Sequence, residues 1–236
     1  MENKIVLICI AIFGNVLPFN LISLSEMYVD SNVASTLIGT MPLFTFLISF
    51  LILKNEKLNL YGLFGILIGF LGMLIFISPF GLSFKSLKLN FSFLIILSAL
   101  FYGFSANLVK IIKNQSPFEI AFISTGCATF FSAPVFVSQI YISDHDLHSI
   151  ISNISMQSFI SATILGVICT GVAIVIFFNL IKTKNAIFAS QSNFLIPCFG
   201  SLWSFIFLGE KLSSQMIYGL VLIVIGGWMV NKSIKI

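Results

Sequence analysis

Eight long apolar runs, separated by short polar segments, constrain the fold of this 236-residue chain more than any other feature. No Lys or Asp lies in the interior of any run. In a helix, about 20 apolar residues are needed to cross the hydrocarbon core of a bilayer. The sequence therefore predicts eight transmembrane segments, at approximately residues 5–24, 33–53, 61–80, 91–109, 118–142, 158–181, 185–208 and 215–231.

These segments are expected to be helices, because they are apolar on all faces, whereas the strands of a membrane barrel alternate apolar and polar residues. The composition agrees with a protein that has lipid as its solvent. Hydrophobic residues make up 58% of the chain and charged residues 8%, against about a quarter charged in soluble domains. The predicted fold class is an all-α polytopic membrane protein, a bundle of eight transmembrane helices.

The 12 basic residues are all lysines, so a nucleic-acid surface would have no arginine to build on. The four cysteines stand singly, without the paired spacing of a zinc site or a disulfide framework. His145 and His148 flank Asp146 in the segment SDHDLHS. A metal site is one interpretation of that cluster, but its polar surroundings favour a solvated loop. We expect no metal, no cofactor and no nucleic-acid partner.

The lysines divide unevenly between the two sides of the membrane that eight spans define. Nine lie on the side of both termini, and three, Lys85, Lys88 and Lys211, lie on the other side. Because cytoplasmic loops carry an excess of positive charge, the sequence predicts cytoplasmic termini, in the cytoplasmic (inner) membrane of a bacterium. The first run is expected to remain as a helix, because polar residues such as Asn15 interrupt it and no clear signal-peptide cleavage site follows.

The front of the chain recurs at its end in the same order. The difference in residue number between a front residue and its match near the end falls only from 159 to 155 to 154 along the chain. The first three helices therefore correspond to the last three. The matches are FNLI at 19–22 and 178–181, Ala34-Ser35 and Ala189-Ser190, EKL at 56–58 and 210–212, Gly65 and Gly219, and Gly72 and Gly226.

Each of the first three helices matches the helix five spans later in the chain. Because five is an odd number, the two helices of each match are expected to cross the membrane in opposite directions. Inverted repeats allow a transporter to open a midplane site to each side in turn; an old duplication kept only for packing is the alternative. Residues 89–236 would form a complete repeat of five helices, and residues 1–88 an incomplete repeat of three. The chain is thus expected to have a ten-helix architecture without its first two helices.

Two segments share a small-residue helix start, a proline, an acidic-basic-Leu loop and a glycine-rich last helix. They are NVASTLIGTMPLFTFLISFLILKNEKLNLYGLFGILIGFLGMLIFI and NAIFASQSNFLIPCFGSLWSFIFLGEKLSSQMIYGLVLIVIGGWMV. With these segments, and with ALFYGFSANLVK at 99–110 as the opening helix of a half, the chain resembles the EamA-type family of the drug/metabolite transporter superfamily. The resemblance implies a carrier of amino acids, nucleosides or similar small metabolites that works by alternating access.

Polar residues inside the spans are the candidates for a substrate site, because a polar group turned toward lipid is costly. An amide offers a donor and an acceptor to a neutral or zwitterionic metabolite without burying a charge. Hydrogen bonding between helices is the alternative role of such amides. The candidate substrate-binding residues are the amides Asn20, Asn107, Asn179, Gln191 and Asn193 and the aromatic residues Tyr102, Phe104 and Trp203.

Pro42 and Pro197 are expected inside the second and seventh helices at equivalent positions, where each removes a backbone hydrogen bond. Paired interruptions indicate a binding region, although a kink that improves packing is the alternative. Glycines at 62, 65, 69 and 72 share one helix face, and glycines recur at 219, 226 and 227. We assign these glycines to close helix packing or to self-association in a homo-oligomer.

The sequence favours a non-enzymatic transporter with a small-molecule substrate and the lipid bilayer as its partners. A truncated, inactive remnant or a helper subunit of such a transporter is the alternative, because the first repeat is incomplete. An intramembrane enzyme is disfavoured, because no nucleophile pairs with a base and no acids cluster within a span. No Asp or Glu lies near the middle of a span, so we expect no proton relay through a buried carboxylate.

Overall fold

The computed structural model describes residues 2–29, 31–53, 60–77, 89–142, 154–208 and 214–233. Within these ranges all regular structure is helical. By length and composition, five helical rods are suited to crossing a membrane, and three shorter apolar helices accompany them. The predicted fold class, an all-α polytopic membrane protein, is confirmed. Both EKL loops and the segment SDHDLHS lie outside the described residues.

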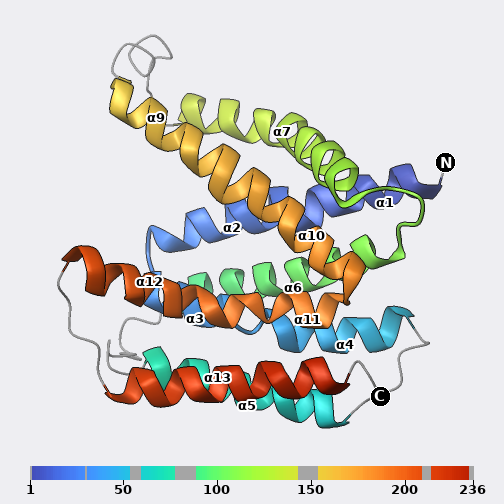
Figure 1. Ribbon diagram of the computed structural model, residues 1–236. Coiled ribbons are helices and arrows are strands. Elements are labelled where there is room, and N and C mark those ends of the chain that lie inside the picture. Colours follow the sequence, from blue (N-terminus) through green and yellow to red (C-terminus); the bar gives the residue numbers. More distant parts are fainter. Residues whose placement is uncertain are drawn as a thin grey trace.

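The first three predicted spans each correspond to a helical region. The first is one continuous rod of α1 (Glu2–Ala11), the π-helix η1 (Ile12–Val16) and α2 (Leu17–Glu26). The second consists of α3 (Ser31–Ile38) and α4 (Met41–Leu53), and the third is α5 (Leu60–Ile77). These three regions run lengthwise along the bundle in roughly the same line (Figure 1).

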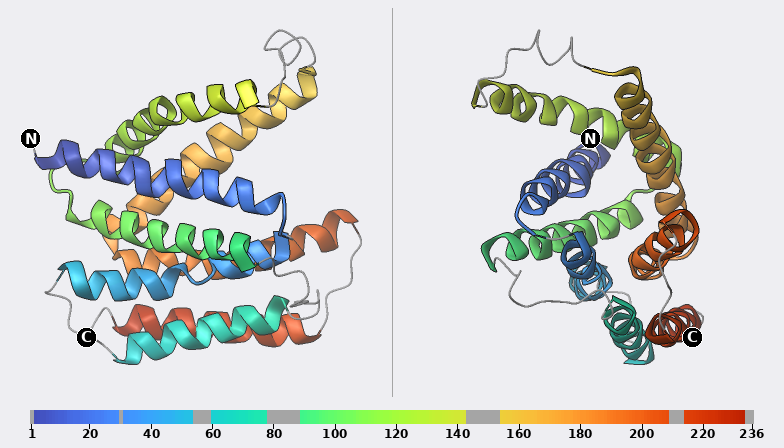
Figure 2. Two further views of the ribbon diagram at one scale, coloured as in Figure 1. Left: turned by 180° about the vertical axis from the view of Figure 1, so that it is seen from behind. Right: turned by 90° about the vertical axis from the view of Figure 1, so that its left-hand side faces the viewer.

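The remaining five predicted spans are also helical. A diagonal rod stands out among them, because it crosses the direction of the other helices (Figure 1). Two views from other sides show α7 opposite α5 and α13, with α6 between them (Figure 2). The helices are α6 (Leu89–Ile111), α7 (Pro117–Ile142), the diagonal rod of α9 (Met156–Ile164), the π-helix η4 (Leu165–Val172) and α10 (Ala173–Thr183), then α11 (Ala186–Ser190), α12 (Ser192–Leu208) and α13 (Ser214–Ser233).

The two π-helices occur in corresponding helices of the repeat. With the offset of 159 that relates the FNLI segments, η1 corresponds to residues 171–175, and η4 ends within that range. The Leu17 N–H donates to the carbonyl of Ile12, five residues earlier, and Thr170 Oγ1 donates to the carbonyl of Leu165, also five residues earlier. Single π turns inside α-helices are frequent at functional sites.

The second span breaks before Pro42 and not around it. The Gly39 N–H donates to the carbonyl of Ser35 and the Thr40 N–H to that of Leu37, and α4 then begins at Met41. Pro42 lies in the first turn of α4, where backbone N–H groups have no partner within the helix. The expectation that Pro42 removes a hydrogen bond inside a helix is therefore wrong. Pro197 lies within α12.

The glycine faces of α5 and α13 form a seam in which the two helices run antiparallel. A Cβ atom at Gly65 would lie 2.8 Å from the carbonyl oxygen of Gly226, and one at Gly72 would lie 2.7 Å from that of Gly219. Gly65 corresponds to Gly219, and Gly72 to Gly226. A two-fold rotation between the helices therefore exchanges the two contacts, as expected for inverted repeats. These glycines serve close packing within the chain.

Helix α6 occupies the centre of the bundle and contacts different partners with different faces. A Cβ atom at Gly103 would lie 2.9 Å from the backbone nitrogen of Thr45, so α6 and α4 are in close contact there. A Cβ atom at Gly14 in η1 would lie 3.1 Å from Ser105 Cβ. One face of α6 therefore meets α4 and another meets η1.

Two lysines join α6 and α10 crosswise where these helices end. Lys110 Nζ, in the last turn of α6, donates to the carbonyl of Lys184 at 3.1 Å. Lys182 Nζ, in the last turn of α10, donates to the carbonyl of Ile112. Cations near helix C-termini satisfy carbonyl groups that have no partner within the helix. The ends of α6 and α10 therefore lie together.

Candidate functional site

Asn107 lies fully buried on the face of α6 that meets α4. Its Nδ2 group donates to the carbonyl of Thr45 at 3.1 Å and to that of Gly103 at 2.8 Å. Because Gly103 has no side chain, α4 approaches closely enough for the first of these bonds. The Oδ1 atom of Asn107 is buried and has no hydrogen-bond partner in the described part of the chain. Asn107 can thus accept one further hydrogen bond.

Asn193 approaches α4 one turn away from Asn107. Its Nδ2 group donates to the carbonyl of Ser190 at 2.8 Å and to Met41 Sδ at 3.1 Å. Met41 and Thr45 are four residues apart on α4, so they share a face. Asn107 and Asn193 therefore contact neighbouring turns of the same helix, as the sequence hypothesis of a shared site requires.

Gln191 stands at the break between α11 and α12. Helix α11 begins just after Asn185, which is its N-cap: the Oδ1 atom of Asn185 accepts a hydrogen bond from the Phe188 N–H. The Gln191 side chain is 7% exposed, and a Cβ atom at Gly227 of α13 would lie 3.5 Å from its Oε1 atom. Neither Oε1 nor Nε2 has a hydrogen-bond partner among the described residues. A buried amide without partners costs about 1–3 kcal/mol.

The structure places the other predicted amides differently. Asn20 donates through Nδ2 to the carbonyl of Val16, one turn earlier on its own rod, at 2.7 Å. Asn179 is exposed on α10. In the described part of the chain, neither forms a hydrogen bond with Asn107, Gln191 or Asn193. The structure brings Asn107 and Asn193 to the same helix, α4, whereas Gln191 approaches Gly227 of α13.

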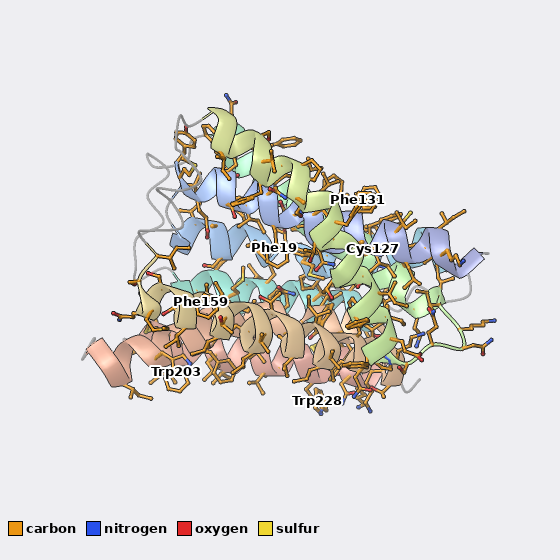
Figure 3. The ribbon with its side chains drawn as sticks, turned by 90° about the horizontal axis from the view of Figure 1, so that it is seen from above. Phe19, Cys127, Phe131, Phe159, Trp203 and Trp228 are labelled. Atoms are coloured by element: carbon orange, nitrogen blue, oxygen red, sulfur yellow. The ribbon has the colours of Figure 1, made fainter. Side chains whose placement is uncertain are left out.

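The three predicted aromatic residues do not surround the amides as a group. Tyr102 packs against Phe19, with ring centroids 6.4 Å apart, and Phe104 packs against Phe13 at 5.2 Å. Both contacts are with the first rod. Trp203 is 54% exposed and lies at the edge of the bundle on α12 (Figure 3). Tyr102 and Phe104 thus face the rod that contains η1.

An open groove of about 520 Å³ lies between η1, α2, α7 and η4, and sequence reasoning missed it. Seen from above, Phe19 lies in the open angle between α7 and the diagonal rod (Figure 3). The sequence signal was the spacing of small polar residues on α7, which share one helix face. The lining residues are Asn15, Phe19, Thr125, Ala128, Thr129, Ser132, Ala133, Phe136 and Thr170.

The EamA-like transporter family matches residues 2–78 and 90–232, which is nearly the whole chain. The chain belongs to this family. The resemblance inferred from the sequence is therefore confirmed, and this EamA-like chain is an integral membrane protein.

Two relatives extend the comparison. "Uncharacterized transporter YxxF" of Bacillus subtilis (strain 168) is 28% identical over 218 residues, which cover 90% of this chain and 66% of that protein. This EamA-like chain therefore spans slightly less than two thirds of the length of that relative. A solved crystal structure of a protein 13% identical in sequence has a TM-score of 0.74 and covers 98% of this chain and 75% of its own. At that identity the likeness shows the fold alone.

Proposed function

We propose that this EamA-like chain carries a small neutral or zwitterionic metabolite across the membrane by alternating access, with Asn107, Gln191 and Asn193 holding the substrate. The observation that carries the proposal is the Gln191 amide, which is buried with both polar atoms unpaired among the described residues. Native structures seldom leave such groups without a role. A substrate that supplies an acceptor to Nε2 and a donor to Oε1 would offset the cost of burying them.

The charges near the amides support a substrate without net charge. In the described residues, the acidic side chains are Glu2, Glu26 and Glu119, and all three lie at or near the ends of helices. Among the described residues, a cationic substrate would find no carboxylate beside Asn107 or Gln191 to compensate its desolvation. The amides instead suit a molecule with a donor and an acceptor of its own, such as an amino acid, a nucleoside or a sugar.

The relation between the two repeats supports alternating access as the mechanism. The contacts of the glycine seam exchange under a two-fold rotation, and inverted repeats related in this way can adopt two packings that open to opposite sides. We place the protein in the cytoplasmic (inner) membrane of a bacterium with both termini inside. The nine-to-three division of lysines supports this orientation.

A binding screen followed by a flux measurement tests the proposal. L-Amino acids, nucleosides and hexoses are screened for a rise in the apparent Tm of the purified protein, because a ligand of the folded state stabilises it. Uptake of the binding compound is then measured in proteoliposomes. We expect Gln191→Leu to lower uptake about tenfold or more, since it removes two hydrogen bonds to the substrate, each worth about 1 kcal/mol.

The stability of the variant separates a binding role from a structural one. Because Gln191 has no partner to lose among the described residues, Gln191→Leu should keep or raise the apparent Tm without ligand. Gln157→Leu, which changes an exposed glutamine of α9 in the same way, should leave uptake unchanged. Unchanged uptake in Gln191→Leu, or the absence of a ligand in all three classes, would contradict the proposal.

A helper subunit or inactive remnant is the second candidate, and the exposure of the diagonal rod favours it. No residue of α9 or η4 is buried, although the corresponding first rod packs along α6 through η1 and α2. A carrier with one rod uncovered would bind its substrate without completing transport. Ligand binding with no saturable uptake in proteoliposomes would support this candidate over the active carrier.

A further inference from the structure

The groove between η1, α2, α7 and η4 is separate from the amides of the proposed substrate site. Helix α6 lies between the two places: Gly103 and Asn107 on α6 face α4, whereas Tyr102 contacts Phe19, which lines the groove. A ligand in the groove would therefore not touch Asn107. The groove needs an explanation of its own.

Asn15 gives the groove a polar group that is ready for a ligand. Its side chain lines the groove and is only 6% exposed. No hydrogen bond joins this side chain to any other residue that the structure describes. Asn15 lies in the π-helix η1, and Thr170 across the groove lies in the π-helix η4. The two π-helices interrupt corresponding rods at overlapping positions, and such interruptions are frequent at functional sites.

The threonines of the groove define what a ligand must offer. Thr125 Oγ1 donates to the carbonyl of Ala121 at 2.7 Å, Thr129 Oγ1 to that of Thr125 at 3.0 Å, and Thr170 Oγ1 to that of Leu165 at 3.0 Å. A hydroxyl group that already donates its proton keeps only its acceptor sites. These three side chains can therefore accept hydrogen bonds from a ligand but cannot donate to it.

The rest of the lining carries no charge, and apart from Ser132, whose hydroxyl can both donate and accept, it is apolar. Phe19 and Phe136 offer aromatic surface, Ala128 and Ala133 leave room beside them, and none of the lining residues is ionisable. A charged ligand would lose its hydration without gaining an opposite charge. We propose that this groove binds a small uncharged molecule with an aromatic or similarly apolar body and at least one O–H or N–H donor.

A pair of matched probes tests this specificity. The protein in lipid nanodiscs is titrated with 2-naphthol, a fluorescent and uncharged aromatic alcohol, and with 2-methoxynaphthalene, which has the same rings and no donor. Empty nanodiscs measure partition into lipid. We expect saturable binding of 2-naphthol, at least about fivefold tighter than that of 2-methoxynaphthalene, because one hydrogen bond distinguishes them.

Variants locate the binding in the groove. Asn15→Leu should raise the Kd of 2-naphthol about tenfold, and Thr129→Val, which removes an acceptor at nearly constant volume, about threefold or more. Thr163→Val is the matched control, because the Thr163 hydroxyl also donates to a carbonyl of its own helix, at 2.8 Å, but lies on the exposed face of α9. This control and Gln191→Leu should leave the Kd unchanged.

Two results would overturn the inference. The first is equal affinity for both probes, which a groove filled by lipid acyl chains would produce. The second is a wild-type Kd for 2-naphthol in folded Asn15→Leu, or in Thr129→Val if the first variant does not fold. Because Gln191→Leu tests the amide site and Asn15→Leu tests the groove, failure of the proposed transport function and failure of this inference can be told apart.

Discussion

The glycine seam of α5 and α13 and the elements around the groove beside η1 lie on opposite sides of the bundle (Figures 1 and 2). Each place involves two helices that the internal sequence match relates. At the seam, backbone atoms of the two helices are in contact at glycines that the repeat relates. At the groove, the two related rods are covered unequally. The buried share of an 18-residue window is 28% in the first rod and 11% in the diagonal rod.

This difference indicates where the bundle is fixed and where it can adapt. The backbone atoms in contact at the seam cannot shift without moving their helix, so α5 and α13 are expected to move as one body. The groove combines two π-helices, an exposed rod and the buried Asn15, whose side chain forms no hydrogen bond with another described residue. Changes of shape during binding or transport are therefore expected on the groove side. Three substitutions of Gly by Ala, chemically identical, test this contrast.

Gly226→Ala should have the largest effect. Its Cβ atom would lie 2.5 Å from the carbonyl oxygen of Gly65 and 2.6 Å from the backbone nitrogen of Gly69. Neither atom can move without displacing α5, so we expect the free energy of unfolding to fall by about 2–3 kcal/mol. Thermal unfolding in detergent measures it. An unchanged apparent Tm would contradict the backbone contact of the seam.

Gly69→Ala should have a smaller effect, because it meets a side chain. Its Cβ atom would lie 2.8 Å from Cε2 of Phe194, a ring that is almost fully buried. The ring can shift partly, so we expect a loss of about 1 kcal/mol. Phe194→Leu should destabilise the Gly69→Ala protein less than it destabilises the wild type, as a double-mutant cycle of apparent unfolding free energies would show. If the effects of Gly69→Ala and Phe194→Leu on the unfolding free energy were strictly additive, the contact between residues 69 and 194 would be contradicted.

Gly126→Ala on α7 should have the smallest effect, and of the opposite sign. Among the described residues, no atom beyond the adjoining backbone of α7 lies within 4 Å of the added Cβ, and the residue is exposed. Alanine favours the helix by up to about 1 kcal/mol over glycine, so the apparent Tm should stay the same or rise. A marked fall would mean that α7 is packed against something at Gly126 and that the contrast with the seam is false.

The sequence predicted the helices, and it assigned the glycine faces to close packing or self-association, because both depend on local patterns. Apolar run length locates a span, and glycines at spacings of three and four residues must share a helix face. The order of the matching residues also indicated that Gly65 is equivalent to Gly219 in the sequence. Asn107, Gln191 and Asn193 were chosen as polar residues within apolar spans, and the structure brings Asn107 and Asn193 to neighbouring turns of α4, with Gln191 beside α13. Their role in binding stays a prediction.

The break near Pro42 and the groove were harder to predict for different reasons. A proline ring clashes with the carbonyl four residues earlier, and α3 does end at Ile38, four residues before Pro42. The effect of the proline thus acts upstream of its own position.

The groove depends on the angle between α7 and the diagonal rod, which no local pattern encodes. Asn15 was visible in the sequence only as a polar interruption of an apolar run.

The crossed bonds of Lys110 and Lys182 make the two helix ends depend on each other. Each ammonium group belongs to one helix and is held by a carbonyl just beyond the end of the other. A motion that parts α6 from α10 at this end would cost both hydrogen bonds. The two lysines that mark sidedness in the sequence would therefore also oppose the separation of these helix ends.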